Sequence, residues 1–289
     1  MIAPSRDAEV AIIGLGVIGG SVTLRLRERG TAVRGFSTSV TDRAEAQQAG
    51  VAVAATLDDA VRGVGLVLIA VPLGAIAIVA NQVLGAAPAH ATILHAGSLQ
   101  RPEAVQAPPE VASRVIGTHP LAGSHRSGFG AARADIFHNA TVFVEQRADA
   151  RQREDAEFFW SMAGAARIEY APASAHDDAM AWISHLPQLA STALGITLAE
   201  MVERMPNERM TLNPGPGARD ATRLAMSPLD MWQPILERAP AATIDVLRAL
   251  EGSVRHLRMA LEERNWPAVR ELWTQAQGWR TSVERGESA

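Results

Sequence analysis

The sequence predicts an α/β protein: a doubly wound, mostly parallel sheet followed by an all-helical domain. Three observations support this prediction. Short apolar runs alternate with helical stretches over the first part of the chain, a glycine-rich turn follows the first run, and no strand-like run occurs after Pro172. Strands that alternate with helices are joined by right-handed crossovers and pair mostly in parallel. We therefore expect two domains, residues 1–172 and residues 173–289.

Seven apolar runs are expected to form the sheet. The run at 10–13 is too short for a helix and apolar throughout, which is typical of a buried parallel strand. The other strands are expected at 32–36, 64–72, 91–97, 113–120, 140–146 and 166–172. Helices are expected between them at 17–29, ended by Gly30, and at 42–48, 57–61 and 75–84.

Long amphipathic stretches predict the helices of the second domain, at 174–203, 229–261 and 266–283. Ser174 and Asp177 stand at the spacing of a capping box and should start the first of these helices. Pro187 should kink it, because proline cannot donate a backbone hydrogen bond. His176, Asp177 and Asp178 are interpreted as charge at this helix start. No metal is expected, since the histidines lack ligand spacing.

The composition narrows the chemistry. The net charge of -4 provides no basic field for nucleic acid, and no apolar stretch is long enough for a membrane span. The first residues lack the features of a signal peptide, so we expect a cytoplasmic protein. The chain has no cysteine and no lysine, which excludes thiolate nucleophiles and Schiff bases. Acid–base chemistry at neutral pH therefore falls mainly to the eight histidines.

The stretch GLGVIG at 14–19 is a G-x-G-x-x-G motif that follows a strand and opens a helix. In that context the first glycine permits the turn, the second lets a pyrophosphate approach the backbone, and the third lets helix and strand pack. The helix N-terminus adds N–H groups and partial positive charge. The motif predicts dinucleotide binding rather than a purely structural turn, through Gly14, Leu15, Gly16, Val17, Ile18 and Gly19.

The end of the second strand bears on the choice between NAD and NADP. A carboxylate expected there would bind an adenosine ribose hydroxyl and repel a 2′-phosphate. This sequence has Ser37, Thr38 and Ser39 instead, with Arg43 as a possible phosphate partner. We therefore favour NADP. The alternative is that the serines cap the following helix.

Two further segments, HAGSLQ at 95–100 and THPLAGS at 118–124, leave strands at the carboxyl edge, where open parallel sheets bind ligands. They should face the nicotinamide. With the glycine turn, they make the sequence resemble the prephenate and arogenate dehydrogenase family of cyclohexadienyl dehydrogenases. The resemblance continues through AVP at 70–72, HPLAGSHRSGFGAARADIF at 119–137, HDDAMAWISHLPQLASTAL at 176–194 and GARDATRLAMSPLDMW at 217–232.

The resemblance implies a Rossmann domain, a helical dimerisation domain and a homodimer formed through the C-terminal helices. The aromatic-bearing apolar faces of those helices need a partner. It also implies hydride transfer from C4 of a cyclohexadienyl carboxylate to NAD(P)+, while the C1 carboxylate leaves as CO2 and the ring becomes aromatic. Val71 and Pro72 would help to bind the cofactor.

The resemblance also implies roles for single residues. His119 would accept the proton of the C4 hydroxyl, although a lone loop histidine is usually a surface residue. Ser98 would contact His119, the nicotinamide or the hydroxyl; alone it would be a turn serine. Arg223 would grip a substrate carboxylate through its planar fork. Arg219, one turn earlier, would either support Arg223 or be a solvated surface residue.

The remaining substrate-binding candidates are less specific. Ser184 and Gln188 lie four residues apart and share a helix face, while His185 is either a ligand contact or a buried, satisfied histidine. Trp232 matches a family tryptophan near the substrate. The family often has histidine where this chain has Gln188. Within the histidine loop the candidates are Ser124, His125 and Arg126, with a plain loop as the alternative for Ser124 and Arg126.

The sequence departs from the family pattern at three positions. An acid is replaced by His95, a lysine by Gln100, and a second acid, which in some members helps to select the substrate, by His125. These changes remove charges from the edge of the pocket. They favour an alternative substrate such as 4-amino-4-deoxyprephenate. A second alternative is a non-catalytic dinucleotide sensor, against which the intact set of Ser98, His119 and Arg223 argues.

Overall fold

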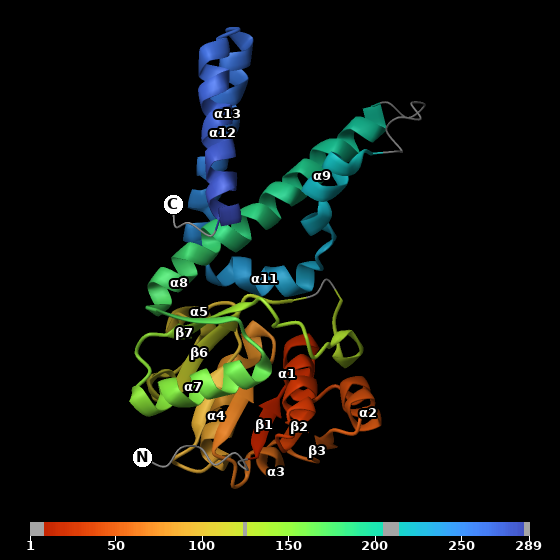
Figure 1. Cartoon of the computed structure of the whole chain (residues 1–289), viewed down its shortest axis with the longest axis vertical. Coiled ribbons are helices and arrows are strands. Elements are labelled where there is room, and N and C mark those ends of the chain that lie inside the picture. Colours follow the sequence, from red (N-terminus) through yellow and green to blue (C-terminus); the bar gives the residue numbers. More distant parts are fainter. Residues whose placement is uncertain (1–8, 124–125, 205–213, 286–289) are drawn as a thin grey trace. The chain divides into compact units, whose positions relative to one another are not determined.

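The computed structural model describes residues 9–123, 126–204 and 214–285, which form two compact units (Figure 1). The first unit takes the described residues up to Met180 together with Met226–Pro240. The second takes Ala181–Ala225 and the described residues from Ala241 onward. The expected boundary at residue 172 therefore differs from the division by contacts, because α8 (Ala173–Met180) and α11 (Leu229–Arg238) belong to the first unit.

The first unit is built on one eight-stranded sheet with the order β3-β2-β1-β4-β5-β6-β7-β8. Every neighbouring pair is parallel except β6 and β7, which are antiparallel. The first six strands have the order of dinucleotide-binding folds, which confirms the predicted fold class. The strands are β1 Val10–Ile13, β2 Val33–Phe36, β3 Ala52–Val53, β4 Leu66–Ile69, β5 Thr92–His95, β6 Val115–Pro120, β7 Thr141–Glu145 and β8 Arg167–Ala171.

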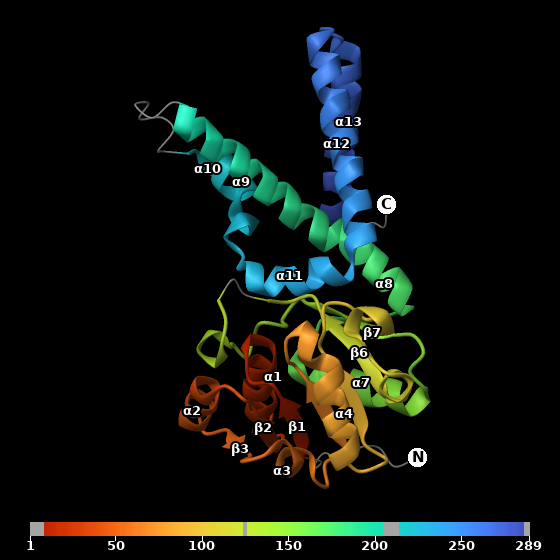
Figure 2. The ribbon, with the colours of Figure 1, turned by 180° about the vertical axis from the view of Figure 1, so that it is seen from behind.

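Both faces of this sheet are covered, because successive side chains of a strand point to opposite sides. Val10 and Ile12 of β1 belong to one apolar cluster, and Ala11 and Ile13 belong to another. Helices α1 and α7 contribute residues to the first cluster, and α3, α4 and α6 contribute residues to the second. Figures 1 and 2 show the sheet with its helices from opposite sides. The helices of this unit are α1 Val17–Glu28, α2 Val40–Gln48, α3 Leu57–Val61, α4 Ile76–Ala86, α5 Pro102–Val105, α6 Pro109–Arg114, α7 Ala150–Ala163, α8 and α11.

The second unit is helical. The π-helical segment Ala181–His185 precedes Pro187, so the regular hydrogen-bond ladder is already altered where we expected a kink. The other elements are α9 Leu186–Arg204, α10 Pro216–Ala221, the short helix Arg223–Met226, α12 Pro240–Glu262 and α13 Trp266–Arg285. Helices α12 and α13 run side by side as a hairpin in both views (Figures 1 and 2).

The stretch predicted as one helix over 229–261 forms two helices in the structure. The expectation of a single helix over 229–261 is wrong, since α11 ends at Arg238 and α12 begins at Pro240. Proline disfavours helical geometry in the residue before it and has no N–H to donate, yet it suits the first turn of a new helix. Among the described residues, none of the helices combines the length and apolarity that crossing a bilayer requires.

Candidate active site

The glycine turn between β1 and α1 leaves room for a pyrophosphate. Gly14 has a φ of +98°, and a Cβ there would lie 2.3 Å from the Ala70 carbonyl oxygen. A Cβ on Gly19 would lie 1.9 Å from the Gly14 carbonyl oxygen, whereas a Cβ on Gly16 would meet nothing within 4 Å. The first and third glycines are thus needed for packing, and Gly16 borders open space at the start of α1. This cradle fits the cofactor predicted from the motif.

The other residues of the predicted cofactor site differ in their surroundings. Leu15 is fully buried, and its side chain packs against Gly35, so it serves the core. Val17 and Ile18 are half-buried at the start of α1. Val71 lies beside Gly14, with its Cγ1 3.1 Å from the position of a Gly14 Cβ. Pro72 follows it and is exposed.

The turn after β2 holds an arginine. Ser39 is the N-cap of α2 and accepts a hydrogen bond from the Asp42 N–H at 3.2 Å, which confirms the capping alternative for this serine. Ser37 is buried, and its hydroxyl accepts a bond from the Ser39 N–H. The Arg43 guanidinium donates to the Ser37 carbonyl oxygen at 2.7 Å. Thr38 is exposed. A cation therefore lies beside the turn that has no carboxylate at positions 37–39.

His119 lies at the carboxyl edge that also carries the glycine turn. The parallel register aligns Ile13, Ile69, His95 and Gly117 in one row across β1, β4, β5 and β6. The glycine turn follows this row at one strand, and His119 follows it at another. The register thus brings the predicted base and the predicted cofactor turn to one edge of one sheet, as expected for parallel strands.

A hydrogen-bonded chain extends from His119 into the protein. His119 Nδ1 lies 3.0 Å from His176 Nε2, and His176 Nδ1 lies 2.7 Å from Asp177 Oδ1. The His176 side chain is fully buried and that of Asp177 nearly so. The Asp177 carboxylate also accepts bonds from the backbone N–H groups of Gln100 at 2.8 Å and Arg101 at 3.0 Å.

The structure therefore overturns two interpretations of this segment. Asp177 does not complete a capping box with Ser174, and His176 and Asp177 are not solvated charge at a helix start. Helix α8 begins at Ala173, and both side chains are buried within the unit. His176 contacts His119, and Asp177 accepts from the N–H groups of Gln100 and Arg101. Only the third member of the group, Asp178, is exposed, and it pairs with Arg101.

Ser98 stands in the loop that these bonds hold. It is half-buried, between buried Gly97 and Leu99. The Gly97 N–H donates to His95 Nδ1 at 3.1 Å. Trp232 of α11 packs in the same apolar cluster as Leu99. The predicted tryptophan therefore shares an apolar cluster with one residue of the serine loop, within the first unit.

The two residues that replace family charges are buried beside this loop. Burial, with a smaller contribution from nearby Arg147, lowers the pKa of His95 to about 4, so its imidazole is neutral at physiological pH. Gln100 donates from Nε2 to the Phe143 carbonyl oxygen at 3.0 Å. In the described part of the chain its Oε1 is buried with no hydrogen-bond partner.

Residues of the second unit were predicted to bind substrate. Gln188 is buried and donates from Nε2 to the Leu224 carbonyl oxygen at 2.8 Å. His185 is buried, with Nδ1 3.4 Å from the Thr243 hydroxyl, which supports its interpretation as a buried, hydrogen-bonded histidine. Ser184 is half-buried. Arg219 is exposed and donates to the Pro214 carbonyl oxygen at 3.0 Å, and Arg223 is exposed.

The histidine loop is only partly described. Ser124 and His125 lie outside the described residues. Arg126 is exposed.

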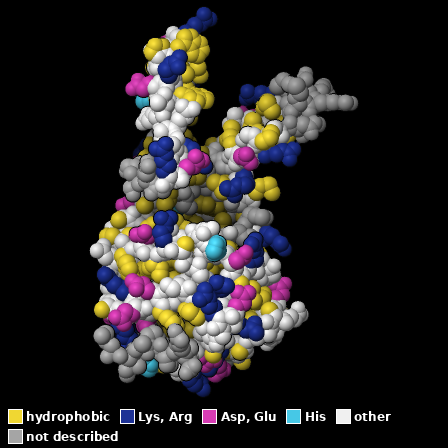
Figure 3. All heavy atoms as spheres, viewed as in Figure 1, with side chains coloured by type: hydrophobic (Ala, Val, Ile, Leu, Met, Phe, Trp, Pro, Cys, Tyr) yellow, Lys and Arg dark blue, Asp and Glu magenta, His cyan; other side chains and the backbone are white. Residues whose placement is uncertain are grey.

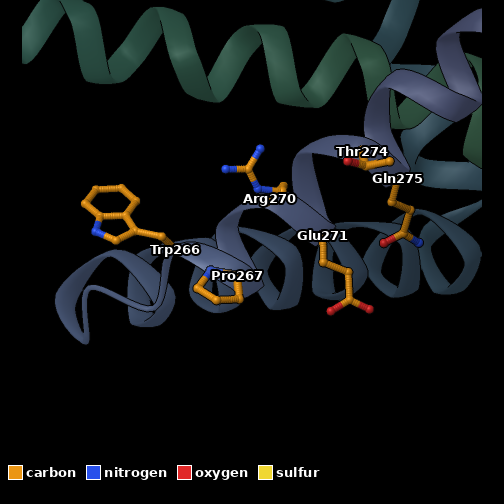
Figure 4. A pocket seen from close by; sticks show the side chains of 6 residues that line it. All are labelled: Trp266, Pro267, Arg270, Glu271, Thr274 and Gln275. Carbon is orange, nitrogen blue, oxygen red and sulfur yellow. The ribbon is translucent and has the colours of Figure 1, made fainter.

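Away from these residues, α13 carries an open hollow lined by one helix face (Figure 4). Its lining, Trp266, Pro267, Arg270, Glu271, Thr274 and Gln275, contains no residue of the predicted site.

Family models match nearly the whole chain. The nucleotide-binding domain of prephenate dehydrogenase matches residues 22–169, and the dimerization domain of prephenate dehydrogenase matches residues 172–275. The chain belongs to the prephenate dehydrogenase family. The predicted resemblance is thereby confirmed, together with the combination of a nucleotide-binding domain and a helical dimerization domain.

Individual members agree with this assignment. A cyclohexadienyl dehydrogenase of Zymomonas mobilis is 31% identical over 95% of this chain and 96% of its own length. A prephenate dehydrogenase from A. aeolicus, crystallised with hydroxyphenyl propionate and NAD+, has a TM-score of 0.85 at 22% identity, over 96% of this chain and 98% of that chain. An arogenate dehydrogenase from Synechocystis has a TM-score of 0.77 at 22% identity, over 95% and 99%. At these identities the two structures support the fold.

Proposed function

We propose that this protein oxidises and decarboxylates a cyclohexadienyl carboxylate, prephenate or arogenate, with NAD(P)+ as hydride acceptor. The observation that carries the proposal is the placement of His119. Its imidazole stands at the carboxyl edge that bears the glycine turn and is bonded to His176, in a chain of the prephenate dehydrogenase family. A proton acceptor beside a hydride acceptor is what oxidation of a ring alcohol requires.

In the proposed mechanism His119 accepts the proton of the C4 hydroxyl as the C4 hydride leaves. Bound NAD(P)+ supplies the hydride acceptor. The electron pair of the breaking bond to the C1 carboxylate enters the ring, CO2 departs, and the ring becomes aromatic. Ser98, in the loop held by Asp177, orients the hydroxyl or the imidazole. Arg223 holds a carboxylate, and Arg219 supports it.

We propose further substrate contacts at residues of the motifs that resemble the family. They are Ser124, His125, Arg126, Ser184, His185, Gln188 and Trp232. Trp232 has support from the fold, because it packs against the apolar cluster that contains Leu99, the residue after Ser98. His185 and Gln188 have less support as substrate contacts. The His185 side chain already contacts Thr243, and the Gln188 side chain already donates to the Leu224 carbonyl oxygen.

NADP is the proposed cofactor. The turn after β2 offers hydroxyls and the guanidinium of Arg43 and has no carboxylate at positions 37–39. A 2′-phosphate would meet the Arg43 cation there, and no carboxylate at positions 37–39 would repel it.

A second candidate substrate is 4-amino-4-deoxyprephenate, whose ring carries nitrogen in place of the C4 oxygen. The observation that favours it is the loss of two charges beside the serine loop, where neutral His95 and Gln100 are buried. Both positions carry charge in the family pattern that the sequence resembles. An altered charge balance around the substrate is a means of selecting between substrates of different charge.

One panel of assays tests these proposals. The purified protein is mixed with prephenate, arogenate or 4-amino-4-deoxyprephenate and with NAD+ or NADP+, and absorbance of the reduced nicotinamide is followed. We expect turnover with NADP+ and one of the first two substrates. His119→Asn should lower kcat by on the order of a hundredfold or more and leave cofactor binding nearly unchanged. His90→Asn, at an exposed histidine, is the control.

The outcomes of the panel distinguish the two candidate substrates from a non-catalytic sensor. Turnover only with the amino substrate selects the second candidate. No reduction with any pair, while the protein still binds a dinucleotide, supports the non-catalytic sensor. An unchanged kcat in His119→Asn would remove this histidine from the mechanism.

A further inference from the structure

The hydrogen-bonded chain of His119, His176 and Asp177 has a direction that the donor and acceptor rules determine. We propose that Asp177 and His176 are positioning residues that hold the His119 imidazole in its Nδ1–H tautomer, which leaves the lone pair on Nε2. The proposal rests on the proposed function in so far as His119 is the base of the reaction. It goes beyond that function by assigning the proton-accepting atom and the residues that select it.

The Asp177 carboxylate accepts two backbone hydrogen bonds. Its Oδ1 accepts from the Gln100 N–H at 2.8 Å and its Oδ2 from the Arg101 N–H at 3.0 Å. A carboxylate that receives two backbone N–H groups is bound as the anion, which only accepts hydrogen bonds. The 2.7 Å contact with His176 Nδ1 therefore requires the proton to be on that nitrogen.

The position of the proton on His176 determines which nitrogen of His119 carries a proton. When the His176 ring is neutral, a proton on Nδ1 leaves an acceptor at Nε2. The 3.0 Å contact between His176 Nε2 and His119 Nδ1 then requires His119 to donate from Nδ1. In that tautomer the basic lone pair of His119 is on Nε2, the ring nitrogen opposite to the buried chain.

Ring contacts and the shared carboxylate restrict the movement of His176. The His176 ring meets the His119 ring edge-to-face, with centroids 5.1 Å apart, and meets the Phe143 ring at 5.4 Å. Phe143 is the β7 residue paired with His119 in the sheet register. The same carboxylate that binds His176 binds the N–H groups two and three residues after Ser98. One buried anion thus holds both the base and the serine loop in place.

The wild-type protein provides a direct test. In the full chain labelled with 15N-histidine, long-range proton–nitrogen NMR spectra report which ring nitrogen carries the proton. The His119 signals are assigned by their loss in His119→Asn. We expect the Nδ1–H tautomer at a pH where the ring is neutral. The Nε2–H tautomer in the wild type would overturn the proposal. This measurement needs neither substrate nor cofactor, so it stands apart from the question of turnover.

Two variants at one position form a matched pair. His176→Gln can still present an acceptor near the position of Nε2, whereas His176→Asn can still reach Asp177 but not His119. We expect His176→Asn to lower kcat on the order of tenfold to a hundredfold with KM nearly unchanged, and His176→Gln to recover part of that loss. His138→Asn, at an exposed histidine, is the control.

The outcomes separate the two proposals. Equal losses of kcat in both His176 variants, with the His119 tautomer unchanged, would overturn the positioning role. The expected tautomer in a protein without turnover on any substrate would leave the positioning role standing and reject the proposed function.

Discussion

At the end of β5 the imidazole of His95 is 3% exposed and accepts a hydrogen bond from the Gly97 N–H. Burial penalises its charged form, and nearby Arg147 adds to the effect, so the pKa falls from 6.5 to about 4. Asp177 opposes the shift but does not reverse it. The neutral ring is thus the form that the folded protein stabilises.

This shift predicts how stability depends on pH. The folded pKa lies below the unfolded value, so between pH 6.5 and about 4 the unfolded chain binds the extra proton. Stability from this group is complete above that window and is lost as the pH falls through it, on the order of 3 kcal/mol. His95→Asn keeps an acceptor for Gly97 and removes the titration. Urea unfolding from pH 7 to 4.5 should therefore show a shallower loss of stability than in the wild type.

The control for this prediction is His90→Asn, which changes an exposed histidine. Its unfolding free energy should follow the wild-type curve. Parallel curves for His95→Asn and the wild type would contradict the assignment of the acid-side loss to His95.

At the scale of elements, the turn between β1 and α1 has one glycine needed for packing and another that borders the predicted cofactor site. A Cβ on Gly19 would collide with the Gly14 carbonyl oxygen, whereas a Cβ on Gly16 would enter open space. Gly19→Ala should therefore lower the melting temperature and abolish dinucleotide binding together. Gly16→Ala should change folding stability by about 1 kcal/mol or less, the cost of a poorer N-cap, while weakening NADP+ binding by roughly tenfold or more.

Thermal unfolding and calorimetric titration with NADP+ measure the two effects. The glycines serve as controls for each other, since the substitution is the same. Equal NADP+ affinity in Gly16→Ala and the wild type would mean that the pyrophosphate does not approach this backbone.

At the scale of the whole molecule, the α12–α13 hairpin has large apolar side chains in contact with solvent. Trp266, Trp273 and Trp279 are 60%, 62% and 61% exposed, and Figure 3 shows hydrophobic side chains gathered on this hairpin. Exposed apolar surface of this kind marks interfaces. Because the family's dimerization domain matches residues 172–275, we propose a homodimer formed through these helices.

Replacing one of these tryptophans tests the dimer. Trp273→Asp should weaken self-association by tenfold or more, because it removes apolar area and would bury a charge. Sedimentation velocity over a micromolar concentration series should show the variant shifting to monomer while the wild type remains dimeric. Arg280→Ala, which removes an exposed ion pair on the same helix, should sediment as the wild type. A monomeric wild type would refute the proposed dimer.

Much of the fold could be predicted from local pattern. The run at 10–13 was recognised as a strand because all four residues are apolar, and both faces of β1 prove to be covered. The two-residue β3 was missed, since a strand of that length has no periodicity. The break at 238–240 was also missed, because the apolar period continues through Pro240 while the backbone cannot.

The candidate site likewise has parts that local sequence locates and parts that depend on distant residues. Amino-acid order alone located the glycine turn and the two strand ends that carry Ser98 and His119, since these are patterns of neighbouring residues. The roles predicted for Ser98 and His119 came from the resemblance to the family. His176 and Asp177 were misread because their partners are distant: His119 is 57 positions away and Gln100 is 77. Such partners meet only when strands align at one edge and α8 turns its first residues inward. Burial then places the Asp177 carboxylate, which looks like surface charge in the sequence, in the hydrogen-bonded chain that ends at His119.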